Sequence, residues 1–135
     1  MTLRRADVEA MLERGHPLQL SGQDLRAADL SGLDLAGADF AYAHLEGASF
    51  RYASLVGAVL WAATASGADF TGADLSDANL GTADLSNARL DAAVLKRANL
   101  LGSTLTGTSL AGADLHGANT TGATEKEGLP WSKSN

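Results

Sequence analysis

The sequence predicts an all-β solenoid, in which the chain bends at short, regular intervals around a narrow apolar core. Two observations support this prediction: Leu or Phe recurs at every fifth residue, and only 5% of the chain is aromatic. The recurrence runs from Leu20 to Leu115, and Ala65 is its one exception. A compact globule usually centres its core on several large aromatic side chains, so a narrow and repetitive core is expected instead.

Two further positions of the repeat are also regular. Two residues before the Leu or Phe, Ala stands without a break from Ala38 to Ala98. Two residues after it stand 12 of the 15 glycines, and the residue just before it is often Asp or Asn. The five-residue period therefore extends to positions on both sides of the Leu or Phe.

A period of five fits neither an α-helix nor a flat strand. In a helix, a step of five residues turns the side chain by about 140°, so the leucines would spiral over every face. In a strand, residues five apart point to opposite sides. A chain that bends after every fifth residue solves both problems, because each Ala and Leu then points inward and the other three residues form the corner.

The glycines predict the shape of the corners. Glycine two residues after the Leu fits the second central position of a type II turn, which needs a positive φ. Where another residue stands there, we expect a different turn, because a positive φ costs an ordinary residue about 1–2 kcal/mol. Such corners include those at Asp77, Thr82, Asn87, Ala92 and Arg97.

The stretch "SGADFTGADLSDANL" shows the repeat as Ala, then Asp or Asn, then Leu or Phe, then two variable residues. Over residues 18–124 this pattern resembles the motif of the pentapeptide-repeat family. The resemblance implies a right-handed quadrilateral β-helix of about five coils, in which four pentapeptides make one coil. On that basis, residues 20 apart are stacked neighbours.

The charges favour the same four-sided coil independently. Stacked like charges repel each other and unlike charges attract modestly, so a correct spacing favours opposite pairs. No like-charged pair occurs in the repeats at a spacing of 20. Three opposite pairs do: Arg26 with Glu46, Asp69 with Arg89, and Asp77 with Arg97.

The chain is expected to have three regions. Residues 3–14 predict a short amphipathic α-helix, with Val8, Met11 and Leu12 on one face, that caps the first coil. The regions are an N-terminal capping helix at 1–16, the β-helix at 17–124 and a C-terminal tail at 125–135 that either caps the last coil or is disordered. The expected structural core includes Leu30, Leu35, Phe40, Phe50, Phe70, Leu75 and Leu90.

The composition and the repeat argue against several functions. A net charge of −6 argues against direct binding of nucleic acid, and no run approaches the roughly 18 apolar residues of a membrane span, so a cytoplasmic protein is expected. Metal and cofactor sites are not expected either, because Asp24, Asp29, Asp34 and Asp39 would point from four different sides. A core filled by Leu leaves no pocket for catalysis, so we predict that the protein is not an enzyme.

The remaining prediction is a structural scaffold that binds another protein, or a second copy, through its outer faces. The candidate interaction face is an apolar stripe with little charge, formed by Tyr42, Val59, Trp61 and Leu101. The family resemblance implies an alternative. Some members mimic DNA, bind type II topoisomerases and protect gyrase, and a negatively charged column fits that function loosely.

Overall fold

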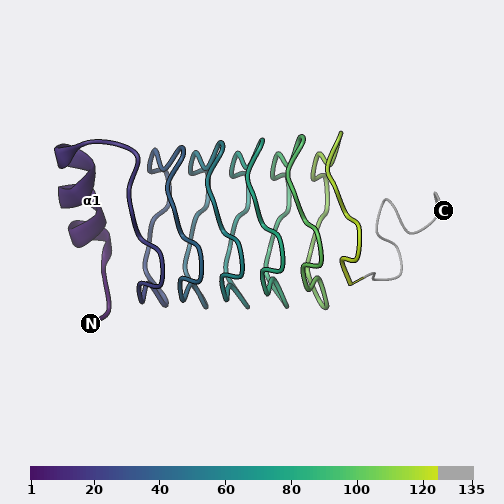
Figure 1. Ribbon diagram of the computed structural model, residues 1–135, viewed down its shortest axis with the longest axis horizontal. Coiled ribbons are helices and arrows are strands. Elements are labelled where there is room, and N and C mark those ends of the chain that lie inside the picture. Colours follow the sequence, from purple (N-terminus) through teal and green to yellow (C-terminus); the bar gives the residue numbers. More distant parts are fainter. Residues whose placement is uncertain (125–135) are drawn as a thin grey trace.

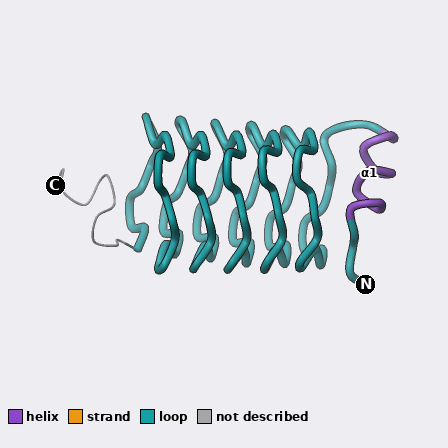
Figure 2. Tube along the Cα trace, turned by 180° about the vertical axis from the view of Figure 1, so that it is seen from behind, coloured by secondary structure: helices purple, strands orange, loops and turns teal. Residues whose placement is uncertain are grey.

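The structure is a computed structural model, and it describes residues 1–124. One helix, α1 (Arg5–Arg14), is followed by a column of stacked coils (Figure 1). The described coils contain no extended strands. They are joined by isolated β-bridges, one residue at a time, so the column is drawn as turns and loops along its length (Figure 2).

The β-bridges show how many residues make one coil. All of them are parallel, and all but one join residues 20 apart, as Gln19 does with Asp39 and Asn99 with Asn119. Four pentapeptides therefore complete one coil, which confirms the four-sided prediction. The handedness and the exact number of coils stay predictions.

Every corner has a positive φ at the same position, which corrects the prediction that corners without glycine avoid it. The value of φ is +67° at Gly72, and it is +54°, +58° and +59° at Thr82, Ala92 and Arg97. All nine corners without glycine share this left-handed conformation: Ala27, Tyr42, Tyr52, Ala62, Asp77, Thr82, Asn87, Ala92 and Arg97.

The hydrogen bonds between coils explain this uniformity. The N–H group of each of these corner residues bonds to a carbonyl of the next coil, as the Thr82 N–H does to the Leu101 carbonyl at 2.7 Å. A corner that relaxed to another turn would lose this bond. The stack therefore holds a conformation that costs an isolated residue about 1–2 kcal/mol.

The core is a continuous stack of inward Ala, Leu and Phe side chains. Phe50 stacks on Phe70 with ring centroids 4.9 Å apart, and it meets Phe40 edge-on at 5.7 Å. Burying such side chains is the main source of stability, about 1.5–3 kcal/mol for each large residue before entropy is subtracted. The expected core residues have no exposed surface: Leu30, Leu35, Phe40, Phe50, Phe70, Leu75 and Leu90.

Helix α1 covers the N-terminal end of this core. Val8 is fully buried, Leu3 is nearly so, and Met11 and Leu12 pack against the core. The helix begins two residues later than predicted. Where it begins, the Asp7 carboxylate accepts a hydrogen bond from the Arg4 N–H at 2.8 Å.

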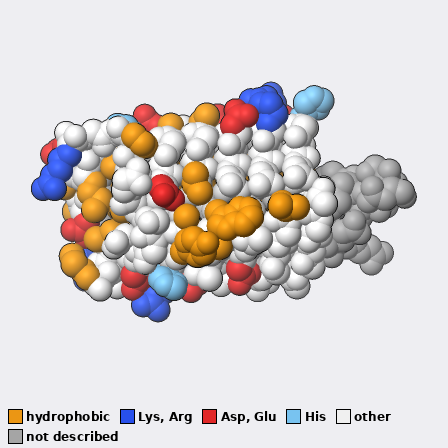
Figure 3. Space-filling model, viewed as in Figure 1, with side chains coloured by type: hydrophobic (Ala, Val, Ile, Leu, Met, Phe, Trp, Pro, Cys, Tyr) orange, Lys and Arg blue, Asp and Glu red, His pale blue; other side chains and the backbone are white. Residues whose placement is uncertain are grey.

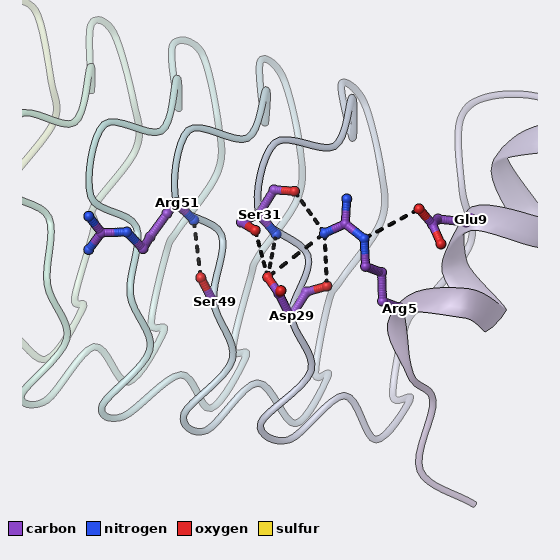
Figure 4. Close-up of polar contacts among 6 residues, drawn as sticks. All are labelled: Arg5, Glu9, Asp29, Ser31, Ser49 and Arg51. Carbon is purple, nitrogen blue, oxygen red and sulfur yellow. Dashed lines mark hydrogen bonds and ion pairs between the residues drawn. The ribbon is translucent and has the colours of Figure 1, made fainter.

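Polar contacts also fix α1 to the first coil. The Arg5 guanidinium donates hydrogen bonds to the carbonyl oxygens of Asp29 and Ser31, at 3.2 and 2.9 Å, and to the Glu9 carboxylate at 3.3 Å (Figure 4). Arg5 therefore ties the helix to a corner of the column, while Val8 covers the core.

The last described coil is more polar and less covered. Ser103 and Thr108 are buried where most coils hold Ala, and the Thr108 hydroxyl donates a hydrogen bond to the Leu85 carbonyl at 2.7 Å. Leu110 and Leu115 are partly exposed. The tail, which was predicted to cap this end or to be disordered, lies outside the described residues.

A candidate interaction face

The Asp and Asn residues that precede each Leu have a structural function. The Asp39 carboxylate accepts a hydrogen bond from the Ala41 N–H at 2.9 Å, and the Asn79 side chain accepts one from the Gly81 N–H at 3.0 Å. This two-residue contact is an Asx turn, which stabilises the start of a corner. The sequence analysis assigned these residues no structural function. Their position two residues before the first corner N–H was the signal that could have identified the turn.

The aspartates do not assemble into a metal site. Asp24 pairs with Arg26 at 2.8 Å, and hydrogen bonds from that guanidinium hold the pKa of Asp24 well below its usual range. Asp29 accepts a hydrogen bond from the Ser31 hydroxyl at 2.6 Å, which lowers its pKa as well. Over residues 1–124, His, Asp and Glu form no group that could hold a metal ion.

In the same range, no helix is long and apolar enough to cross a membrane.

One of the three predicted stacked ion pairs forms. Two atoms of the Arg97 guanidinium contact the Asp77 carboxylate at 2.9 and 3.1 Å, and these hydrogen bonds lower the pKa of Asp77. Both residues are exposed, so solvent screens their attraction and the pair adds little to stability.

The other two pairs lie on adjacent coils as predicted, but their charged groups bind elsewhere. Arg26 pairs with Asp24 on its own coil instead of Glu46. Asp69 forms a β-bridge with Arg89, yet its carboxylate pairs with Arg51 at 2.9 Å. The reason is that an exposed side chain has several partners within reach, and backbone register does not choose among them. In the described column, each of the five basic residues lies within 3.9 Å of a carboxylate.

Partial burial also acts on Asp69. It raises the pKa of this carboxyl, but hydrogen bonds from Thr71 and Arg51 outweigh the effect, so the pKa lies below its usual range. The carboxylate is thus held in its charged form by two neighbours, one on its own coil and one on the coil before.

The predicted face residues share one side of the column. Val59 forms β-bridges with Asp39 and Asn79, and the Tyr42 N–H bonds to the Trp61 carbonyl at 2.9 Å. We name the stacked residues 19–22, 39–42, 59–62, 79–82, 99–102 and 119–122 the Trp61 side. Its four candidate residues are Tyr42, Val59, Trp61 and Leu101.

The Trp61 side exposes several large apolar side chains and little charge. Tyr42 is 63% exposed and Leu101 38%, while Val59 and Trp61 are partly exposed. Asp39 is the single charged residue among the positions of this side. Figure 3 shows hydrophobic side chains gathered along the middle of one side of the column, with most charged groups toward its margins.

Gly81 provides the space for the Trp61 ring. A Cβ atom at residue 81 would lie 2.3 Å from Cζ3 and 2.4 Å from Cε3 of Trp61, so the indole rests against the backbone of the next coil. Tyr52 rests on Gly72 in the same way. Sequence reasoning missed this contact. Gly81 lies outside the corner position that the other repeat glycines occupy, and this irregularity was the available signal.

We expect Gly81→Ala to displace the Trp61 indole from the surface. The new methyl group would overlap the ring, so the protein should lose about 1–3 kcal/mol of stability and the Trp61 fluorescence should change. The measurement uses a Trp131→Phe background, in which Trp61 is the remaining tryptophan. Ser66→Ala, at the equivalent position of the next side, is the control. An unchanged emission spectrum in Gly81→Ala would contradict the contact.

The repeat region matches a known family. The sequence profile described as pentapeptide repeats matches in eight copies, over residues 19–51, 43–81, 53–90 and 83–122. The chain belongs to the pentapeptide-repeat family. No curated protein sequence matches this pentapeptide-repeat protein.

Solved structures of the family are similar to it. A pentapeptide repeat protein from the Arabidopsis thaliana thylakoid lumen is 39% identical, with a TM-score of 0.73 over 76% of this chain and 71% of that one. One from Nostoc is 29% identical, with a TM-score of 0.73 over 92% and 98%. QnrB1, a plasmid-mediated fluoroquinolone resistance protein, is 23% identical, with a TM-score of 0.58 over 78% and 68%, which indicates a shared fold alone.

Proposed function

We propose that this protein is a non-catalytic scaffold that binds a protein partner through the Trp61 side. The proposal rests on two properties that occur on the same side of the column, a low number of charges and exposed aromatic side chains. The side with a single charged residue, Asp39, is also the side that exposes Tyr42, Trp61 and Leu101. Depletion of charge together with exposed aromatic side chains is typical of the centre of a protein interface.

The setting of Trp61 supports this function. Its indole rests against Gly81, so little conformational freedom remains to be lost when a partner covers it. A ring held in place before binding makes a better anchor than a mobile one, because ordering each side chain opposes association by about 0.5–1.5 kcal/mol. Tyr42 and Leu101 flank it on the same side.

The size of this side favours another protein over a second copy. Five or six coils at about 4.8 Å give a height of about 25 Å, and three extended residues give a width of about 10 Å. The resulting area, about 250 Å², is well below the roughly 800 Å² that each partner buries in a stable interface. A protein partner that also contacts the neighbouring sides of the column would bury the additional area. Two copies that meet only through this flat side would not.

The alternative of a gyrase-protecting DNA mimic receives less support. A DNA mimic needs a continuous acidic surface, but several carboxylates here are paired with cations, as in Arg51 with Asp69 and Arg97 with Asp77. A gyrase supercoiling assay tests this alternative directly. Protection of gyrase from a quinolone by the purified protein would favour it over the scaffold.

The proposed interface is tested with charge substitutions on two sides. Immobilised wild-type protein would capture partners from a cell extract, and each captured protein would be purified and its affinity for the scaffold measured. Tyr42→Glu and Trp61→Glu should weaken that affinity at least tenfold, because both place a charge in the apolar interface. Tyr42→Glu is included because this exposed residue can change without disturbing the contact with Gly81.

Val56→Glu is the matched control, since Val56 is an exposed apolar residue on a different side of the column. It should leave the affinity unchanged. All variants should keep the wild-type far-ultraviolet circular dichroism. Equal binding by the wild type and both Trp61-side variants would overturn the proposal. Sedimentation would reveal a dimer, and a dimer abolished by Tyr42→Glu would mean that a second copy is the partner instead.

A further inference from the structure

The Trp61 side has Asn where the other sides of the column have Asp. At the repeat position just before the inward residue, it holds Asn79, Asn99 and Asn119 in successive coils. Both residue types form the same Asx turn, as at Asp39 and Asn79, so the turn does not decide between them. The three other sides hold no Asn at this position but seven Asp: Asp24, Asp29, Asp34, Asp69, Asp74, Asp84 and Asp114.

The three amides are stacked in a ladder. Asn99 Nδ2 donates a hydrogen bond to Asn79 Oδ1 at 3.0 Å, and Asn119 Nδ2 donates one to Asn99 Oδ1 at 3.4 Å. Each of the two accepting oxygens also accepts a hydrogen bond from a corner N–H group, that of Gly81 or that of Leu101, at 3.0 Å. Three carboxylates stacked in this way would repel each other instead.

The ladder has only N–H groups left for a ligand. A side-chain amide has two acceptor sites on its oxygen and two hydrogens on its nitrogen. At Asn79 and Asn99 both acceptor sites are occupied, by the next amide and by the corner N–H group. One hydrogen of Asn99 Nδ2 remains, and Asn79 Nδ2 donates to no acceptor within residues 1–124. Both side chains are half-buried at the surface, so what they present there is hydrogen-bond donors.

These donors adjoin the apolar part of the Trp61 side. A Cβ atom at residue 81 would lie 3.1 Å from Asn79 Oδ1 and 2.3 Å from Cζ3 of Trp61, so the amide and the indole flank the same glycine. The exposed side chain of Leu101 follows Asn99 by two residues. A partner that covers these two apolar side chains therefore also covers the free N–H groups of the ladder.

We propose that the amide ladder donates hydrogen bonds to free main-chain carbonyl groups of the partner, in a loop or an exposed strand. This inference rests on the function proposed for the Trp61 side and names the chemistry of its partner. Covering an N–H group without pairing it is unfavourable, because the group loses its hydrogen bond to water. Carbonyl groups inside a helix are already paired, whereas those of loops and strand edges are free.

Acidic side chains are a poorer match for these donors. The Trp61 side has no Lys or Arg, and the protein carries a net charge of −6. The field of the whole protein therefore repels an acidic segment, while a main-chain carbonyl group accepts a hydrogen bond without bringing a charge.

Asn99→Val tests the proposal with the partners that the immobilised protein captures. Val59 and Val94 occupy the same position of the repeat, so the column tolerates valine there. The substitution removes the donor but makes the side more apolar, and we expect the affinity for a captured partner to fall at least about fivefold. Asn99→Asp keeps the Asx turn and replaces the N–H group with an oxygen, so it should weaken binding at least as much. Far-ultraviolet circular dichroism of both variants should match the wild type.

Thr104→Val and Asn87→Asp are the matched controls, because they make the same kinds of change on the neighbouring side. Both should leave the affinity unchanged. Equal or tighter binding by Asn99→Val, to a partner whose binding Tyr42→Glu weakens, would overturn the role of the ladder and leave the scaffold function standing. Where Asn99→Val does not fold, equal binding by Asn99→Asp and wild type has the same meaning. A wild-type protein that captures no partner, or only partners that bind Tyr42→Glu equally well, would overturn both proposals.

Discussion

Replacing Phe50 with Ala should lower the free energy of unfolding by about 3–5 kcal/mol. Phe50 is fully buried, stacks on Phe70 with ring centroids 4.9 Å apart and meets Phe40 edge-on. Removing its ring therefore takes a partner from two other rings and leaves a cavity between coils. Because the backbone on either side is held by bonds to two coils, the column has little freedom to collapse into that cavity.

The loss would be measured by urea unfolding, followed by far-ultraviolet circular dichroism. Phe50→Leu should recover most of the stability, because Leu30 and Leu90 occupy the same inward column. Val56→Ala, at an exposed position, should change the stability by no more than about 0.5 kcal/mol. A loss for Phe50→Ala no larger than that of Val56→Ala would show that the aromatic stack is not central to stability.

Val8→Asp should release α1 from the N-terminal end of the column. Val8 has no exposed surface, and a carboxylate in its place would have to be dehydrated against the core. Detachment of the helix avoids that penalty but exposes Met11 and Leu12 as well, so we expect a loss of at least about 3 kcal/mol.

Hydrogen exchange would show which coils are destabilised by Val8→Asp. In a solenoid each coil is supported only by its neighbours, so amides of the first coil, such as that of Leu20, should exchange much faster, while those in the middle, such as that of Leu80, should change little. Glu9→Ala is the control. It removes one exposed contact with Arg5 at 3.3 Å and should cost at most about 1 kcal/mol. Equal protection of Leu20 in wild type and Val8→Asp would contradict the capping role.

The five-residue period was enough to predict the coil, because it decides which side chains point inward whatever the details of the corners. The corners themselves were predicted wrongly at Thr82 and Arg97. Sequence reasoning weighed the conformational preference of each residue alone, whereas the hydrogen bonds between coils impose one conformation on all. Hydrogen bonds between residues about 20 apart therefore outweigh the conformational preference of each corner residue.

On the candidate face, too, the repeat predicts which side a residue lies on but not which contacts its side chain makes. The register placed Val59 and Trp61 on one side correctly, because side follows from position in the repeat. The support of Trp61 by Gly81 depends on where a ring lies, and the choice of Arg51 as the partner of Asp69 depends on reach across the surface. Neither is determined by the repeat, so neither followed from the sequence.

The register of 20 residues per coil also governs what insertions and deletions would do. Loss of twenty residues from the column would leave every later residue on its own side, one layer nearer to α1. Loss of five would keep each Leu inward and the core intact, but it would carry every later residue to the neighbouring side. Trp61 and Leu101 share a side because a whole number of coils separates them. A five-residue deletion between them would place them on different sides. A change in chain length can therefore rearrange this surface without repacking the interior.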